Sequence, residues 1–282
     1  MTLKTIYVAR HGFRLSWETQ SWTSPTGVPR DPPLSAHGED QAKELAQFLK
    51  ENVTRDDVEQ GKVMLLSSPL YRCVQTARPT SEALGLSVHI ENGLGEWYLP
   101  VRKGLHPALS TAQFLSRFFP EGVLAPHDAP KAWVPLLTPP RTGESMHDVH
   151  RRAREFVDRL TSAVDPTSVE TVIVFSHAAT CIAISRALAG DLEVLYHPET
   201  SDPDDARRSS VDRKLEWRED ERLECRAATC SVSKFQRREE SAGGDERVET
   251  RRRRPTWDRV WNGRTDFLPG GEERHWEFSF VE

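Results

Sequence analysis

Three short apolar runs constrain the fold of this chain more than any other feature of its sequence. They are Thr5–Ala9, Val63–Leu66 and Thr171–Phe175, and in each the apolar and β-branched residues follow one another without alternation. A strand that is buried on both faces has this pattern, because neither face of it meets water. The runs therefore predict the inner strands of a parallel sheet.

Two segments between these runs have the periodicity of helices. In Glu39–Leu49 and in Met146–Leu160, apolar residues recur every three or four positions and so fall on one face. Ser145, followed three positions later by Asp148, has the spacing of a helix-capping pair. The alternation of strands and helices predicts an α/β fold, with a mostly parallel central sheet flanked by helices.

The composition divides the chain into three parts. Residues 1–200 carry nearly all the long apolar runs and are expected to form the main folded core. Residues 201–256 are dominated by charged side chains, which predicts a partly disordered insert or linker with one strand at residues 227–235. Residues 257–282 are rich in tryptophan and phenylalanine. Because exposed aromatic mass is costly in water, this C-terminal tail is expected to pack on the core.

Composition and charge also exclude several classes of protein. A net charge of −5 and a pI near 6.1 argue against direct nucleic-acid binding. No stretch approaches the ~18–20 apolar residues of a membrane span, and the N-terminus lacks the pattern of a signal peptide. Four cysteines are too few for a disulfide framework and lack the spacing of a zinc site. We therefore expect a cytoplasmic and/or nuclear protein with no membrane partner.

Basic side chains lie close to the end of each apolar run. Arg10, His11 and Arg14 follow the first run, Arg72 lies after the second, and His177 follows the third. Ligands of open α/β sheets bind at the carboxyl ends of the strands, so these side chains are expected to gather at one edge. Guanidinium groups bind phosphate oxygens in a bidentate manner, and a histidine can act as a nucleophile. The set predicts a site for a dianionic phosphoryl group.

The motifs that carry these residues resemble those of the histidine phosphatase superfamily, which has the phosphoglycerate mutase-like fold. The matching pieces follow the family's order over roughly residues 5–190 and are Arg10-His11-Gly12, Pro33-Leu34-Ser35, Ser67–Ala77, Gly143-Glu144-Ser145 and Ser176-His177. The form Arg-His-Gly-Phe-Arg is similar to the phosphatase branch that includes the Sts/UBASH-type proteins. The cofactor-dependent mutases differ at Phe13 and Arg14, so the resemblance favours hydrolysis over mutase activity.

The resemblance implies a role for each of these side chains. The catalytic residues that it implies are His11 as the nucleophile, Glu96 in the segment Gly93–Trp97 as the candidate general acid, and His177. The alternative for Glu96 is an ordinary loop carboxylate. Phosphate binding is assigned to Arg10, Arg14, Arg72 and His177. No metal and no organic cofactor is implied.

Several alternatives stay open at the level of the sequence. The implied enzyme is a phosphomonoesterase that acts on a phosphorylated small molecule or a phosphoprotein, and nothing in the sequence chooses between them. The charged insert and the aromatic tail also resemble fungal members of the superfamily, some of which are the tau fifty-five-type subunit of RNA polymerase III initiation factor C. In that alternative the chain is a scaffold in a multi-subunit transcription complex.

Two further features have a functional and a structural interpretation. His147 and His150 share one helix face and admit a metal site, although polar positions on a helix explain them more simply. The proline-rich segments Ser24–Pro33 and Ala125–Arg141 are expected to be ordered loops over a cleft.

Overall fold

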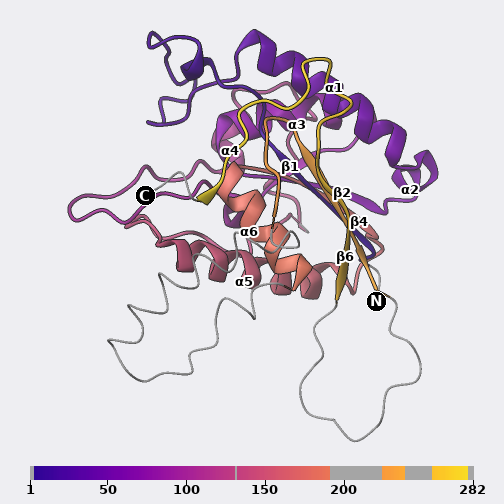
Figure 1. Cartoon of the computed structure of the whole chain (residues 1–282). Helices are drawn as coiled ribbons and strands as arrows, with labels where there is room; N and C mark the ends of the chain where they lie inside the picture. The colour runs from indigo at the N-terminus through magenta and orange to yellow at the C-terminus, as the bar shows by residue number, and fades with distance from the viewer. Residues whose placement is uncertain (1–2, 131, 191–223, 239–255, 279–282) are drawn as a thin grey trace, which may run out of the picture.

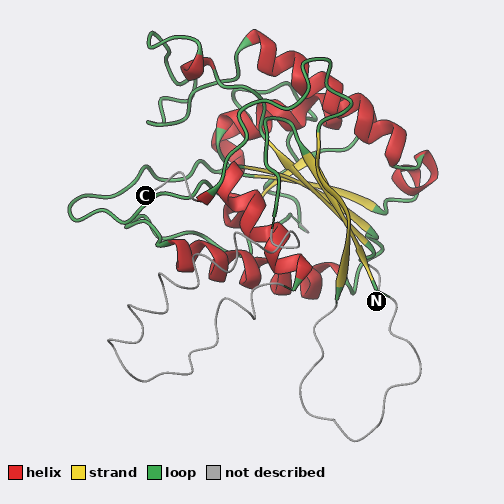
Figure 2. Cartoon of the chain, viewed as in Figure 1, coloured by secondary structure: helices red, strands yellow, loops and turns green. Residues whose placement is uncertain are grey.

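A central sheet of six strands organises the described part of the chain. The computed structural model describes residues 3–130, 132–190, 224–238 and 256–278. Figure 2 shows these strands in yellow. They lie in the order β3-β2-β4-β1-β5-β6. Their bounds are Thr5–Arg10 for β1, Val63–Ser67 for β2, Val88–Ile90 for β3, Thr171–Ser176 for β4, Val232–Arg237 for β5 and Trp257–Arg264 for β6.

The first four strands in this order run parallel to one another, and β5 runs antiparallel to its two neighbours. β3 pairs in parallel with β2, β2 with β4, and β4 with β1, whereas β5 is antiparallel to both β1 and β6. The predicted α/β fold class with a mostly parallel sheet is therefore confirmed.

Helices cover both faces of the sheet (Figure 1). One layer contains α1 and α3, and the opposite layer contains α5 and α6. The bounds of the helices are Ala36–Asn52 for α1, Arg55–Glu59 for α2, Tyr71–Leu84 for α3, Ala112–Leu115 for α4, Met146–Val164 for α5 and Ala178–Ala189 for α6. Two short 3-10 helices, Leu15–Trp17 and Asn92–Leu94, lie in loops.

The three predicted inner strands are confirmed, and burial on both faces explains their continuous apolar pattern. In β1, Ile6 and Val8 pack into the core on the α5–α6 side, while Tyr7 and Ala9 pack on the α1–α3 side. Successive side chains of a strand point to opposite faces, so both faces need apolar residues when both are covered.

Both predicted helices form, and each is longer than its apolar pattern. The observed helices are α1 and α5, and both begin at a capped residue. Ser35 Oγ accepts a hydrogen bond from the backbone N–H of Gly38 at 3.2 Å. Ser145 and Asp148 form the predicted capping box at the start of α5. These caps satisfy backbone donors that lack a partner inside the helix.

The C-terminal residues extend the sheet. A strand was expected at residues 227–235, but β5 begins at Val232, because Cys230 has a φ of 50° and forms part of a turn before it. β6 lies at the edge of the sheet beside β5, and the side chain of Phe278 is buried in the core. Most of the charged segment 201–256 lies outside the described residues. No described helix combines the length and the apolar character needed to cross a bilayer.

Candidate active site

A cleft of about 660 Å³ opens at the carboxyl edge of the sheet, where the residues after β1 and β4 meet. Arg10, His11, Arg14 and Glu96 line it, in agreement with the position expected for them. The other two predicted site residues lie next to these side chains and are fully buried: Arg72 is 1% exposed and His177 is 0% exposed. The structure therefore brings all six predicted residues together.

The ring of His11 is buried and held in a defined orientation. Its Nδ1 atom lies 2.8 Å from the carbonyl oxygen of Gly12. A carbonyl can only accept, so Nδ1 carries the proton and donates, and Nε2 is left with its lone pair. Burial lowers the pKa of His11 well below its usual value, and the nearby Arg72 and Arg10 guanidinium groups lower it further. The imidazole is therefore neutral and has the protonation state of a nucleophile.

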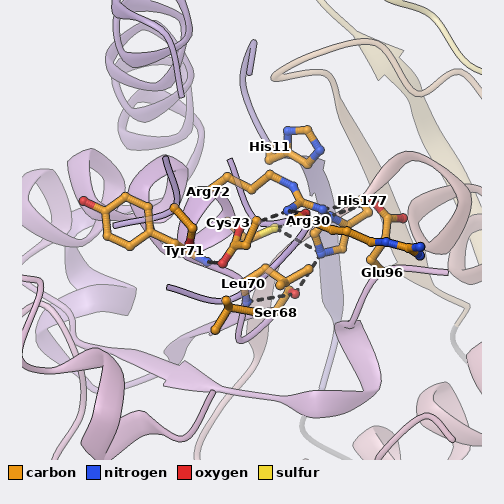
Figure 3. Close-up of polar contacts among 12 residues, drawn as sticks. His11, Arg30, Ser68, Leu70, Tyr71, Arg72, Cys73, Glu96 and His177 are labelled. Atoms are coloured by element: carbon orange, nitrogen blue, oxygen red, sulfur yellow. Dashed lines mark hydrogen bonds and ion pairs between the residues drawn. The ribbon is translucent and has the colours of Figure 1, made fainter. Parts of the chain in front are cut away.

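Arg72 is the centre of the polar network (Figure 3). It lies in the first turn of α3, and its Nη1 donates to Oδ1 of Asp31 at 3.0 Å. Its Nη2 donates to Oε2 of Glu96 and to Nδ1 of His177, each at 3.0 Å. Burial lowers the pKa of Arg72, but the carboxylates of Asp31 and Glu96 outweigh this effect and raise it above its usual value. Arg72 is therefore a fixed cation beneath the cleft.

His177 lies at the N-cap of α6, directly after β4. Because its Nδ1 accepts from Arg72, the proton lies on Nε2, which donates to Oγ of Ser68 at 2.8 Å. Burial lowers the pKa of His177 well below its usual value, and the charge of Arg72 adds to the effect. The ring is thus neutral, because burial and the neighbouring guanidinium groups make a further cation here unfavourable.

A cysteine lies beside His177 without the properties of a nucleophile. The Sγ atom of Cys73 is 3.4 Å from Nε2 of His177. Burial raises the pKa of Cys73 well above its usual value, so the side chain stays a thiol. Since the thiolate is the reactive form, Cys73 is unsuited to attack phosphorus.

Arg10 and Arg14 occupy the inner wall of the cleft. The Nη1 atom of Arg10 donates to the backbone carbonyls of Ala227 and Arg274, and the guanidinium of Arg14 lies 4.2 Å from the ring centre of Trp17. Burial is the main cause that lowers the pKa of each arginine to about 10. Both therefore remain cations at neutral pH.

The three arginines share one unusual feature. The Nε atoms of Arg10, Arg14 and Arg72 are buried, and none has a hydrogen-bond partner among the described residues. A buried N–H without an acceptor is costly and calls for an explanation. Three such donors beside one imidazole form a site suited to an oxyanion with several oxygen acceptors.

The backbone of the segment that carries Glu96 is held by hydrogen bonds from Arg152. Arg152 donates to the carbonyls of Gly93 and Gly95 at 2.6 and 3.2 Å, and it forms a buried ion pair with Glu144. Glu144 belongs to the predicted motif Gly143-Glu144-Ser145, so that motif positions the loop as well as the start of α5. The carboxylate of Glu96 is 20% exposed, and its Oε2 lies 3.4 Å from Nδ1 of His177. It can therefore reach both the cleft and the buried network.

Packing explains why residue 12 is a glycine, because a Cβ there would lie 2.6 Å from the carbonyl oxygen of Gly38. The described residues of the proline-rich segment Ala125–Arg141 do not line the active-site cleft. Several of them line a separate cavity of about 320 Å³.

The structure also adds residues that the sequence did not reveal. Asp31 is fully buried and holds Arg72 from below, and Trp17, Arg30 and Arg274 line the cleft. They come from loops and from the C-terminal segment, so neither periodicity nor position after a strand singles them out. Only Trp17 lies close in sequence to a predicted site residue.

The second histidine pair does not form a metal site. Nδ1 of His150 donates to the carbonyl of Met146 at 2.8 Å, and its Nε2 accepts from Nη1 of Arg186 at 3.0 Å. Both nitrogens of this buried ring are therefore occupied, while His147 is exposed. Within the ranges that the structure describes, no cluster of three histidine, cysteine, aspartate or glutamate side chains has the geometry to hold a metal ion.

Comparison with known proteins places this site in a family. The model of the histidine phosphatase superfamily, branch 1, matches residues 6–213. The chain is 32% identical, over its whole length, to the transcription factor tau 55 kDa subunit of Saccharomyces cerevisiae, of which it covers 60%. It is 25% identical, over 66% of its length, to the ecdysteroid-phosphate phosphatase of Drosophila melanogaster, of which it covers 27%. The chain thus spans less than two thirds of either relative.

Solved structures share the fold at low sequence identity. The ecdysone phosphate phosphatase of Bombyx mori, determined with tungstate, matches 99% of this chain and 100% of its own with a TM-score of 0.59 and 16% identity. A mycobacterial hydrolase matches 100% of this chain and 96% of its own with a TM-score of 0.52 and 19% identity. Together with the family match, the fold and the arrangement of the site assign this chain to the histidine phosphatase superfamily, branch 1.

Proposed function

We propose that this chain is a metal-independent phosphomonoesterase that forms a phosphohistidine on His11. The observation that carries the proposal is a neutral imidazole whose Nδ1 is bound to the Gly12 carbonyl, beside three arginines whose buried Nε donors have no partner among the described residues. The family and its phosphatase relatives support the same reaction class.

The first chemical step transfers the phosphoryl group to the enzyme. Nε2 of His11 attacks phosphorus, the bond between phosphorus and the ester oxygen breaks, and a proton on that oxygen completes the alcohol product. Arg10, Arg14 and Arg72 bind the equatorial oxygens, where charge lies in the transition state. In this mechanism no proton has to leave His11 before the attack, because Nε2 already carries the lone pair.

The second step returns the enzyme to its first state. Water attacks phosphorus, the bond to Nε2 of His11 breaks, and inorganic phosphate is released. In this proposal Glu96 donates the proton to the leaving oxygen in the first step and accepts one from water in the second. Its carboxylate borders the cleft and can therefore reach both oxygens.

Rapid-quench labelling with a ³²P-phosphomonoester tests the proposal. The wild type is expected to give a labelled protein that is acid-labile and base-stable. His11→Ala is expected to abolish turnover and leave no label. His177→Ala is expected to lower the rate by roughly 10²–10³, as the loss of one transition-state contact does, and to leave some label trappable.

Two results would overturn this assignment. A label that persists in His11→Ala and disappears in His177→Ala would reverse the two roles. Measurable wild-type turnover that neither substitution changes would place the active site elsewhere.

A second candidate function follows from the yeast relative. The 32% identity to the tau 55 kDa subunit extends over the whole chain, including the C-terminal segment with β5 and β6. We propose as the alternative that the chain is a nuclear subunit or scaffold of the RNA polymerase III initiation factor C complex. The phosphatase site can be retained in such a subunit.

Purification of the tagged protein from its native cells separates these possibilities. A stoichiometric complex with several large partners, stable in moderate salt, supports the subunit role. A lone monomer or homodimer at the same protein level supports the free enzyme and contradicts the subunit role.

A further inference from the structure

The cleft carries more positive charge than one phosphoryl group needs. Glu96 is its single lining carboxylate in the described ranges, and it is already paired with Arg72. Two guanidinium groups offset the charge of a phosphomonoester dianion. The residues that line the cleft nevertheless include four arginines, Arg10, Arg14, Arg30 and Arg274.

The two outer arginines differ in how they are held. Nη1 of Arg30 lies 3.3 Å from Nδ1 of His106, so Arg30 already has an acceptor within the protein. The guanidinium of Arg274 lies 5.3 Å from the ring centres of both Phe13 and Trp17, and among the described residues it forms no hydrogen bond or ion pair. Its hydrogen-bond donors are therefore available to a ligand.

The backbone of Arg274 is fixed, although its side chain is exposed. Its carbonyl accepts a hydrogen bond from the buried Arg10, and the carbonyl of Glu273 accepts from the backbone N–H of Thr229 at 3.0 Å. A φ of 52° at Arg274 departs from the extended backbone and turns the chain there. Such a left-handed conformation costs energy for a residue with a Cβ and persists where surrounding contacts impose it.

The neighbouring carboxylates have other partners. Glu273 is paired with His37 at 3.0 Å, and Glu272 lies 3.6 Å from Arg226 and 3.4 Å from Nδ1 of His275. Glu277 is paired with Nε2 of His275 at 3.2 Å. Each acid on the Arg274 segment thus has a partner other than Arg274, and the charge of Arg274 has no counter-ion among the described residues.

Trp17 links this charge to the catalytic centre. The guanidinium of Arg14 lies 4.2 Å from the ring centre of Trp17, and that of Arg274 lies 5.3 Å from the same point. Both guanidinium groups contact the same indole ring and therefore lie close together. Two anionic groups of one small molecule can thus bind one arginine each. The aromatic walls Trp17, Tyr98 and Trp276 suit an apolar body between the two anions.

We propose that Arg274 binds a second anionic group of the substrate, so that the preferred substrates are phosphomonoesters with a further carboxylate or phosphate close to the reacting phosphoryl group. This inference rests on the proposed phosphatase function. It gives the C-terminal segment a part in substrate specificity, because Arg274 follows β6 in the chain.

Two matched substrates test this proposal on the full chain. Phenyl phosphate carries one anionic group, and 3- or 4-carboxyphenyl phosphate carries two. For Arg274→Gln we expect kcat/KM for the carboxyphenyl ester to fall about five- to tenfold relative to phenyl phosphate, as the loss of one partly exposed charge contact gives. The change should lie in KM, because this contact is remote from the reacting atoms.

Two variants serve as controls. Arg117 also lies over an aromatic ring, 5.7 Å from the centre of Phe114, but does not line the cleft. Arg117→Gln should leave the substrate ratio unchanged. Arg274→Lys keeps the charge and should retain most of the preference. An unaltered ratio in Arg274→Gln, with wild-type turnover of phenyl phosphate, would contradict the proposal.

Binding to a turnover-deficient protein separates this inference from the proposed function. In calorimetry, His11→Ala should bind the carboxyphenyl ester about fivefold more tightly than phenyl phosphate, and the further change Arg274→Gln should remove the difference. A wild type that hydrolyses neither ester would refute the phosphatase function alone. Equal affinity of His11→Ala for both esters would refute the role of Arg274 alone.

Discussion

Nη2 of Arg72 donates a hydrogen bond to Oε2 of Glu96 at 3.0 Å. The candidate acid and a candidate phosphate ligand are thus bound to each other. A phosphoryl group that binds Arg72 has to compete with this carboxylate. Displacement from Arg72 would leave the Glu96 carboxylate beside the bound phosphoryl group, which is the position that a general acid needs.

The first prediction concerns the leaving group. Glu96→Gln removes the proton donor and should lower kcat for an alkyl phosphate by about 10²–10³. The loss for p-nitrophenyl phosphate should be below about tenfold, because nitrophenolate leaves without a proton. Steady-state kinetics with both esters measures the two effects. Glu121→Gln, an exposed carboxylate outside the cleft, is the control. Equal losses for both esters would exclude Glu96 as the acid.

The second prediction concerns the buried support of Arg72. Asp31 is fully buried, and its Oδ1 and Oδ2 accept from Arg72 Nη1 at 3.0 Å and from the Tyr71 backbone N–H at 2.6 Å. Asp31→Asn removes one partner of a buried ion pair and should lower the free energy of unfolding by about 3 kcal/mol. Urea denaturation measures this loss. An exposed match, Asp56→Asn, should cost less than about 0.5 kcal/mol.

The third prediction concerns pH and His150. Burial is the main cause that lowers the pKa of His150 to about 3, and the charge of Arg186 contributes. As pH falls below 6.5, the unfolded chain gains a proton at this residue before the folded chain does, so stability is lost on acidification. His150→Gln lacks this proton. Its stability deficit relative to the wild type should shrink by about 2 kcal/mol between pH 6.5 and 5.

The measurement for His150 is urea unfolding at both pH values. His147→Gln changes an exposed histidine of the same helix and serves as the matched control. The buried His11 and His177 are present in every protein compared, so their contributions cancel. A deficit of His150→Gln that stays constant with pH would show that His150 is protonated to the same extent in both states.

The fourth prediction concerns metal ions. Hydrolysis of p-nitrophenyl phosphate should survive dialysis against saturating EDTA, because arginines are proposed to supply the positive charge. An enzyme known to need zinc, treated in parallel, verifies that the chelator acts. Activity that disappears with EDTA and returns with zinc or manganese would refute the metal-free mechanism.

The sequence predicted the strands that are buried on both faces and the helices that bury one regular apolar face. The continuous apolar runs became β1, β2 and β4, and the helical periodicity gave the central turns of α1 and α5. β3 was not foreseen, because three residues are too short to establish a pattern. The start of β5 was placed too early, since the left-handed turn at Cys230 depends on contacts outside the segment.

The sequence also determined which basic residues meet at the site. Arg10 ends a parallel strand, and His11, Arg72 and His177 follow such strands. The common direction of parallel strands brings these positions to one edge of the sheet, whatever the loops do. Each strand end meets this constraint independently of the others. Five side chains spread over the first 177 residues could therefore be assigned to one site before any contact was known: Arg10, His11, Arg14, Arg72 and His177. Glu96 was added only through the resemblance to the histidine phosphatase superfamily.

Only the tertiary structure decided the protonation states of the site residues and which further residues contact them. Asp31 reaches Arg72 from a loop, and Arg274 reaches Trp17 from beyond β6. The protonated nitrogen of His11 is set by the carbonyl of Gly12, and the neutral state of His177 by burial beside Arg72. Protonation and ion pairing depend on distance and dielectric environment, which are properties of groups brought together in space. The order of residues along the chain does not contain them.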